Sequence, residues 1–131
     1  MALEIPHNAL ILVADGAKAL LLRNTGHNGE ITLREEERLT PDPNAQGPSG
    51  SRPEDQTPKQ TGEATFAKQI AQTLQSMKQR NGFEALVVAA DPQTLGQLRD
   101  AMHKTVESSV VKSLDKDLTN HTLEDIAAAL R

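Results

Sequence analysis

The chain of 131 residues contains no cysteine, tryptophan or tyrosine, and Phe66 and Phe83 are its only phenylalanines. Without cysteine it can form neither disulfides nor thiolate metal sites, and it has no thiol nucleophile. With so few aromatic rings it lacks the usual platform for stacking single-stranded bases. We therefore expect a core of leucine, valine, isoleucine and alanine, in a protein that fits a reducing compartment.

A strongly basic composition is also absent, because the formal net charge is −4 at pH 7. This charge argues against a broadly basic nucleic-acid-binding surface. The longest apolar runs, such as Ala9–Ala14, are too short to span a bilayer. The first residues show no basic region followed by an apolar one, so no secretory signal is visible. We expect a cytoplasmic protein without membrane insertion, folded as one domain over residues 1–131.

Proline is concentrated in one place. Five of the seven prolines lie between Thr40 and Thr61, where Ala45 is the only other apolar residue. Long segments without a secondary-structure pattern inside a domain are uncommon, and are often functional loops or disordered segments. We expect a flexible loop at residues 40–62, which is either a passive linker or a partner-binding loop.

Three strands are predicted before this loop. Residues 8–14 form a nearly continuous apolar run, and a second run at 17–23 follows Asp15-Gly16. Asp-Gly between apolar runs predicts a tight hairpin with positive φ at both turn positions. Residues 30–39 alternate apolar and polar at their start and then become charged, which is typical of an exposed edge strand.

Helices and strands alternate after the loop. An apolar stripe through Phe66, Ile70, Leu74 and Met77 predicts a helix from about Glu63 to Arg80, closed by a left-handed glycine in Asn81-Gly82. A buried strand at 83–90, a helix starting at Asp91-Pro92, a less regular strand at 106–114 and a helix after Thr122 follow. This order predicts an α/β fold with a five-stranded mixed sheet, in which a three-strand antiparallel meander precedes two parallel strands and three helices flank the sheet. It is the order of the ribonuclease H-like fold.

Several segments, in this order along the chain, resemble one family. The segments are Val13–Ala19, Phe66-Ala67, Gly82–Ala90 with Pro92, Leu95–Arg99 and Asp117-Leu118-Thr119. Together they resemble the bacterial host-attachment proteins, also described as "protein required for attachment to host cells", over residues 8 to 130.

The resemblance implies a relationship to the middle domain of the archaeal and eukaryotic class-1 peptide release factor, which has a ribonuclease H-like fold. In that release factor a Gly-Gly-Gln loop promotes hydrolysis of peptidyl-tRNA. The loop of this chain has Ala45-Gln46-Gly47 and no Gly-Gly-Gln. The resemblance therefore implies a non-catalytic binding or adaptor protein without a cofactor, with the ribosome or tRNA as the partner that it suggests.

Three carboxylates form the alternative, catalytic hypothesis. Asp15 ends the first central strand, Asp91 ends the parallel one, and Glu63 begins the first helix. Acids near these elements of a ribonuclease H-like fold would bind two Mg²⁺ ions and hydrolyse phosphodiesters. Each acid also has a structural explanation, as a turn, a helix cap or a favourable helix-dipole charge. None of the four histidines has the spacing of metal ligands.

Binding residues are predicted in the loop and in the second helix. In the loop they are Gln46, Gly47, Arg52 and Lys59. In the helix, Gly96 lowers helix stability by about 1 kcal/mol relative to alanine, which suggests either a close backbone contact or an open surface for a ligand. Arg99 either binds an anion or pairs with a nearby acid such as Asp100 or Glu63.

Overall fold

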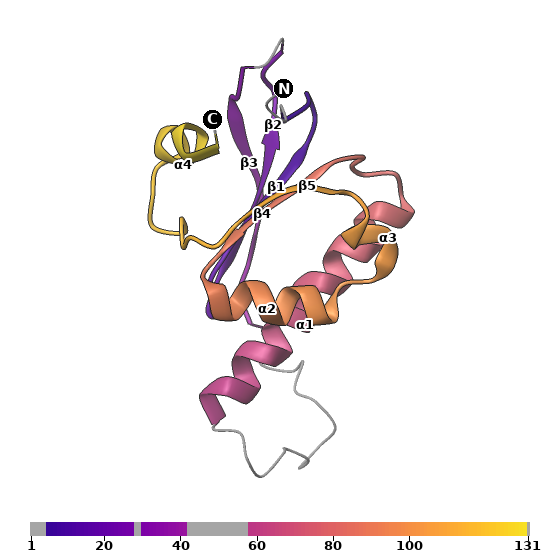
Figure 1. Ribbon diagram of the computed structural model, residues 1–131, viewed down its shortest axis with the longest axis vertical. Helices are drawn as coiled ribbons and strands as arrows, with labels where there is room; N and C mark the ends of the chain where they lie inside the picture. The colour runs from indigo at the N-terminus through magenta and orange to yellow at the C-terminus, as the bar shows by residue number, and fades with distance from the viewer. Residues whose placement is uncertain (1–4, 28–29, 42–57, 131) are drawn as a thin grey trace.

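The computed structural model describes residues 5–27, 30–41 and 58–130. Five strands and four helices are present in this part of the chain (Figure 1). The strands are β1 (Leu10–Ala14), β2 (Ala19–Asn24), β3 (Leu33–Leu39), β4 (Leu86–Ala90) and β5 (Val110–Leu114). The helices are α1 (Pro58–Gln79), α2 (Pro92–Ala101), α3 (Lys104–Glu107) and α4 (Leu123–Leu130).

The strands form one sheet in the order β3-β2-β1-β4-β5. β1 pairs antiparallel with β2, and β2 pairs antiparallel with β3. β4 is parallel to both β1 and β5. The predicted mixed sheet is confirmed, and it is consistent with a ribonuclease H-like fold. β1 and β4 lie at its centre, where all five residues of each strand are buried, as their continuous apolar sequences predict.

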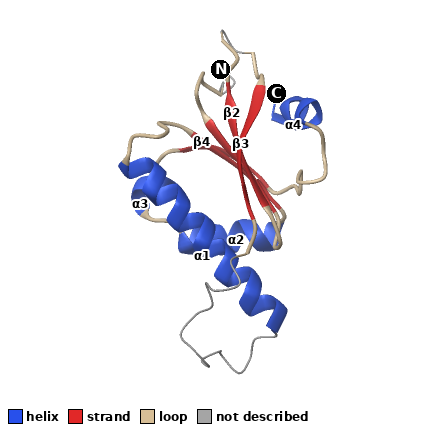
Figure 2. Ribbon diagram, turned by 180° about the vertical axis from the view of Figure 1, so that it is seen from behind, coloured by secondary structure: helices blue, strands red, loops and turns tan. Residues whose placement is uncertain are grey.

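Helices cover both faces of the sheet (Figure 2). Phe66, Ile70 and Leu74 of α1 pack on one face together with Leu98 of α2. Ile126 and Leu130 of α4 pack on the other face, beside Leu118 of the preceding loop. β3 and β5 form the two edges, so the predicted edge position of residues 30–39 is confirmed. Among the described helices, none is long and apolar enough to cross a membrane.

Two helix boundaries differ from the sequence prediction. α1 begins at Pro58 rather than near Glu63, so the segment between β3 and α1 is shorter than the predicted loop 40–62. Proline at a first helical position is favourable because its missing N–H would be unpaired there in any case. At the other end of α1 the left-handed residue is Asn81, with φ 58°, rather than Gly82. The N–H of Gly82 instead donates to the carbonyl oxygen of Met77 at 2.7 Å.

The predicted strand at 106–114 is only half correct. Its first residues belong to α3, a four-residue helix, and the strand begins at Val110. The ring of His103 caps α3 by accepting a hydrogen bond from the N–H of Thr105 at 3.2 Å, and Val106 is buried beneath it. Histidine is not among the preferred N-cap residues, so the sequence carries no standard signal for this helix.

Candidate functional site

Asp15 and Asp91 occupy neighbouring positions at the carboxyl ends of the two central strands. Ala14 is the register partner of Ala90, and each aspartate follows its strand directly. Ligands of open α/β sheets bind outside the carboxyl ends of the strands. The sequence prediction that these two acids share one edge is therefore consistent with the register.

Asp15 organises the turn between β1 and β2. Its Oδ1 atom accepts hydrogen bonds from the N–H groups of Ala17 at 2.7 Å and Lys18 at 2.8 Å. Its own N–H donates to the carbonyl oxygen of Lys18 at 2.9 Å. Because Ala14 pairs with Ala19, the turn has four residues rather than two, and Asp15 does not have the positive φ that the sequence predicted.

Thr119 and Asn120, near the C-terminus, form hydrogen bonds with this turn. The Thr119 hydroxyl lies 3.0 Å from Oδ2 of Asp15 and 2.6 Å from Oδ1 of Asp117. Nζ of Lys18 donates to Oδ1 of Asn120 at 2.8 Å. We call these five residues the carboxyl-end cluster. It joins positions more than one hundred residues apart in the chain, so sequence spacing gives no sign of it.

The second acid, Asp91, caps α2. Its Oδ2 atom accepts a hydrogen bond from the N–H of Thr94 at 3.1 Å, as the Asp91-Pro92 signal predicts. The side chain of the third acid, Glu63, lies outside the described residues. Within the described part of the chain no group of three histidine, cysteine, aspartate or glutamate residues could hold a metal ion. The metal-dependent phosphodiesterase built on these acids stays a prediction.

The four histidines, none of which has the spacing of metal ligands, lie on the surface. His7 and His27 stack on each other with their ring centroids 3.9 Å apart. Nδ1 of His7 lies 3.0 Å from the carbonyl oxygen of Gly26 and is assigned as the donor to it. These contacts fix the ends of two loops and do not bring the histidines to the carboxyl-end cluster.

The structure describes few of the binding residues that the sequence predicts in the loop. Gln46, Gly47 and Arg52, and the side chain of Lys59, lie outside the described residues. The segment leaves β3 at a defined point, because Nε2 of Gln69 in α1 donates to the carbonyl oxygen of Thr40 at 3.0 Å. The predicted loop therefore departs from the sheet beside α1.

Gly96 lies in the middle of α2 with an exposed backbone. No heavy atom lies within 4 Å of the position that a Cβ atom would occupy there. Close packing of another part of the described chain does not explain this glycine. The other sequence interpretation, an open surface, agrees with the structure.

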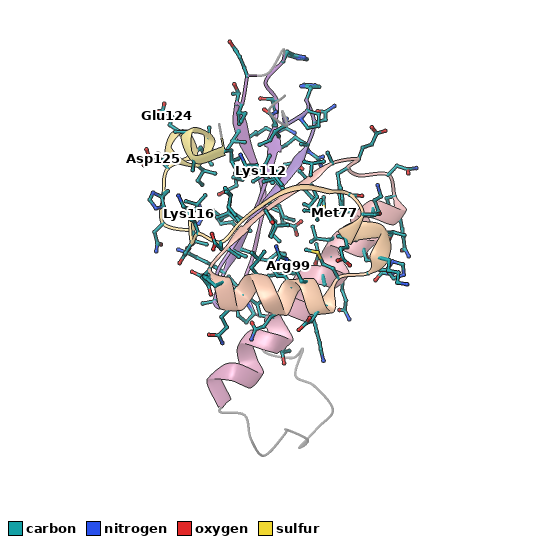
Figure 3. The ribbon with its side chains drawn as sticks, viewed as in Figure 1. Met77, Arg99, Lys112, Lys116, Glu124 and Asp125 are labelled. Carbon is teal, nitrogen blue, oxygen red and sulfur yellow. The ribbon has the colours of Figure 1, made fainter. Side chains whose placement is uncertain are left out.

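Arg99 lies in the last turn of α2, next to β5 (Figure 3). Its Nη2 atom donates to Oγ of Ser113 at 3.1 Å. It forms no ion pair with any described residue, Asp100 included. Arg99 also lines a pocket of about 250 Å³. Arg99 therefore does not lie near a helix start, where the sequence predicted that it could bind an anion, but at the other end of α2 beside an edge strand and a pocket.

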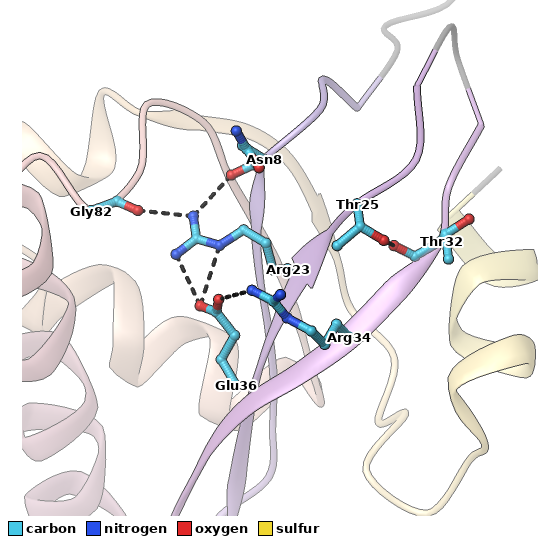
Figure 4. Close-up of polar contacts among 7 residues, drawn as sticks. All are labelled: Asn8, Arg23, Thr25, Thr32, Arg34, Glu36 and Gly82. Atoms are coloured by element: carbon cyan, nitrogen blue, oxygen red, sulfur yellow. Dashed lines mark hydrogen bonds and ion pairs between the residues drawn. The ribbon is translucent and has the colours of Figure 1, made fainter.

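A second polar cluster, which sequence analysis did not identify, surrounds Arg23 of β2 (Figure 4). Nη1 of Arg23 donates to the carbonyl oxygens of Asn8 at 2.9 Å and Gly82 at 2.8 Å. Nε and Nη2 donate to Oε1 of Glu36 at 3.2 and 2.9 Å. Arg34 pairs with Oε2 of the same carboxylate at 2.8 Å. The cluster borders a pocket of about 410 Å³ and joins β2 to β3 and to the loop before β4. It is fully engaged within the protein, so we interpret it as structural.

Stability should depend on the ionisation of Glu36. Burial raises the pKa of its carboxyl, but the hydrogen bonds and charges of Arg23 and Arg34 outweigh burial and lower the pKa below the ordinary value of 4.5. A carboxyl whose pKa is lower in the folded state contributes stability above its unfolded pKa, and this stability is lost as the pH falls through the folded value. Urea unfolding at neutral pH should show that Glu36→Gln is less stable than the wild type. The difference should shrink below pH 4.5. A difference that is independent of pH would contradict this assignment, and Glu37→Gln is the control on the same strand.

One comparison with known proteins gave a match. A model of the family described as "Bacterial archaeo-eukaryotic release factor family 12" matches residues 8–130. No curated protein matches the chain. The matched residues contain the whole sheet, all four described helices and the carboxyl-end cluster.

Proposed function

Because the chain belongs to the bacterial archaeo-eukaryotic release factor family 12, we propose that it is a non-catalytic binding protein that associates with the ribosome. The observation that carries this proposal is the family match over nearly the whole chain, combined with the missing Gly-Gly-Gln sequence. A member of this family without the tripeptide that promotes hydrolysis would keep surfaces that bind a partner and lack the reactive tip. The likeness to host-attachment proteins and the cytoplasmic location stay predictions.

The contacts of the acids support a non-catalytic role. Both described acids of the alternative hypothesis accept hydrogen bonds from backbone N–H groups of their own turn or helix. A metal-ion ligand needs lone pairs that are directed toward the metal, and these hydrogen bonds use part of that capacity. The structural role of Asp15 and Asp91 is therefore sufficient to explain them.

The proposed contact surface consists of segment 42–57, the start of α1 and the exposed side of α2 around Gly96. In the release factor that the sequence resembles, the reactive loop lies between a strand and a helix, and segment 42–57 joins β3 to α1 at the corresponding place. The open space at Gly96 leaves the backbone of α2 accessible to a partner. Close backbone approach is a common reason for glycine inside a helix.

Co-sedimentation with purified bacterial ribosomes tests the proposal. The full chain should pellet with ribosomes, and replacement of residues 42–57 by a Gly-Ser linker of equal length should reduce pelleting by about tenfold, the effect of losing about 1.4 kcal/mol of binding energy. This replacement leaves Pro58 and the helix that it begins intact. If the wild type stays in the supernatant, the ribosome proposal is wrong. If the replaced variant pellets equally, segment 42–57 is not the contact.

Gly96→Gln tests the α2 part of the same surface. The space around Gly96 admits a side chain, and glutamine is the better helix former, so stability should rise by about 0.5 to 1 kcal/mol. Ribosome pelleting should nevertheless fall, because the new side chain occupies the contact surface. Glu124→Gln, at an exposed position of α4 on the other face of the sheet, is the control and should leave pelleting unchanged.

A further inference from the structure

The two edges of the sheet differ in their protection against pairing with another chain. At the β3 edge, residues 34–38 are all charged and exposed. Exposed charges along an edge strand discourage the addition of a further strand. β5 has the sequence Val110–Leu114, with Lys112 as its only charged residue. By this criterion β5 is the less protected edge.

The charge of Lys112 does not protect the β5 edge against the addition of a further strand. Its Nζ atom donates to the carbonyl oxygen of Leu130 at 3.0 Å, near the end of α4. The ammonium group is thereby held against one face of the sheet. In Figure 1 β5 passes in front of the other strands, with α4 on one side and α2 and α3 on the other, and no described element lies in front of it. The outer side of β5 is therefore accessible to an extended chain.

A pocket opens beside this edge, on the face of the sheet that α2 and α3 cover. Its volume is about 250 Å³. The apolar part of its lining includes Leu95 of α2, Met102 directly after α2 and Val110 of β5, and the polar part includes Arg99, Glu107 and Ser113. Side chains of an added strand would alternate between the two faces of the sheet. Every second side chain of such a strand would therefore face the side of the sheet on which this pocket opens.

The pocket contains a positive charge, that of Arg99, which forms no ion pair within the described part of the chain. Arg99 donates one hydrogen bond to the Ser113 hydroxyl and makes no ion pair with a described residue. A guanidinium has five N–H donors and binds a carboxylate well. Glu107 lines the same pocket without forming an ion pair with Arg99, and its negative charge disfavours an acidic side chain at its own end.

We propose that the β5 edge and this pocket bind an extended peptide segment that carries an aliphatic and an acidic side chain on the same face. The peptide would add a sixth strand to the sheet beside β5, with its backbone hydrogen-bonded to the free edge. The aliphatic side chain would enter the pocket between Met102 and Val110. The carboxylate, two residues away and about 7 Å along the strand, would pair with Arg99.

A second copy of the chain fits this edge less well. Two β5 strands related by a two-fold axis at the centre of the strand would place Lys112 opposite Lys112, and like charges directly opposite each other destabilise a sheet. β5 also contains no acid that could meet Arg99. An acidic, partly apolar peptide would place a carboxylate at Arg99 and an apolar side chain at the apolar part of the lining.

Binding can be tested by NMR titration of the full chain with the peptide acetyl-Ser-Thr-Leu-Thr-Glu-Thr-Ser-amide. We expect a dissociation constant of about 1 mM or tighter, with shift changes in β5 and in the residues that line the pocket. Two N-methylated forms report on strand addition. One is methylated at Leu and Glu, and the other at the two flanking threonines. Because alternate N–H groups of an added strand face the sheet edge, one form should lose binding by about tenfold and the other should keep it.

The charge pairing has its own test. Arg99→Gln should weaken binding by about three- to fivefold, the range of an exposed ion pair. The peptide with Gln in place of Glu should bind the wild type equally weakly, and Arg99→Gln should not weaken it further. A control peptide of the same composition, with Leu and Glu adjacent, should bind more weakly because the two side chains would lie on opposite faces.

Three results would overturn the proposal. These are no shift change in β5 at about 5 mM peptide, equal binding of both N-methylated forms, and equal binding of the peptide with adjacent Leu and Glu. The site does not depend on ribosome association. The variant with residues 42–57 replaced should bind the peptide as the wild type does, so failure of one proposal leaves the other testable.

Discussion

Replacement of Asn24 with leucine should lower the free energy of unfolding by about 2 to 4 kcal/mol. Asn24 is completely buried at the end of β2. Its Nδ2 atom donates to the carbonyl oxygens of Ile5 at 3.3 Å and Pro6 at 3.1 Å. Its Oδ1 atom accepts from the N–H groups of Gly26 and Thr32, both at 3.0 Å. All four hydrogen bonds that an amide side chain can make are therefore formed inside the protein.

The cost arises from the groups that remain. Leucine has a similar size but would leave two backbone donors without a partner, and a buried polar group without a partner costs about 1 to 3 kcal/mol. Water cannot replace the amide as long as the site stays closed. The loss of unfolding free energy should therefore be larger than when an asparagine on the surface is replaced with leucine.

Asn120→Leu is the matched control. Asn120 is exposed and its side chain accepts a hydrogen bond from Lys18. Its replacement should change stability by no more than about 0.5 kcal/mol. Urea unfolding of both variants, followed by circular dichroism, gives the comparison. Equal losses in the two variants would mean that the buried network around Asn24 does not hold the N-terminal segment to the β2–β3 connection.

The central strands could be predicted because their signal is local. The runs that became β1 and β4 are apolar at every position, and a strand buried on both faces needs this and little else. The stripe of α1 was equally clear, because Phe66, Ile70 and Leu74 recur at helical spacing and all three are buried. A pattern that reflects the burial of one segment can be recognised from that segment alone, without knowledge of the rest of the chain.

The errors occurred where a less common local contact or a distant residue decides the conformation. Asp15-Gly16 looks like a two-residue turn, but the carboxylate holds a four-residue turn and also meets Thr119. The acids of the catalytic hypothesis could be assigned to one edge of the sheet from sequence, whereas their contacts could not. The pocket beside Arg99 is formed by residues of β4, α2, α3 and β5, which no sequence pattern connects.

Asp15→Ala should destabilise the protein by about 2 to 3 kcal/mol, whereas Asp15→Asn should be as stable as the wild type or more stable, by up to about 1 kcal/mol. Alanine removes the carboxylate oxygen that accepts from the N–H groups of Ala17 and Lys18, and one of the two carboxylates beside the Thr119 hydroxyl. Asparagine keeps an oxygen at the Oδ1 position for the two N–H groups. The measurement is urea unfolding of both variants at neutral pH.

The expected advantage of asparagine follows from a count of hydrogen atoms. The hydroxyl of Thr119 carries one hydrogen but lies within hydrogen-bond distance of two carboxylates, those of Asp15 and Asp117. It can donate fully to one of them. With asparagine at position 15, the side-chain N–H₂ would donate to the Thr119 oxygen and leave the hydroxyl hydrogen for Asp117. If Asp15→Asn is as unstable as Asp15→Ala, the negative charge rather than the hydrogen-bond geometry holds the turn.

The same pair of variants separates the two functional hypotheses. If Asp15 were a ligand of a catalytic metal ion, Asp15→Asn would keep the fold and remove any Mn²⁺-dependent phosphodiesterase activity, because a neutral amide is a much weaker ligand for a hard cation than a carboxylate. If the protein instead binds through segment 42–57 and α2, the wild type and the Asp15→Asn variant should pellet with ribosomes equally well. Loss of a metal-dependent activity in a stable Asp15→Asn variant would favour the enzyme, and unchanged pelleting without any such activity in the wild type would favour the binding protein.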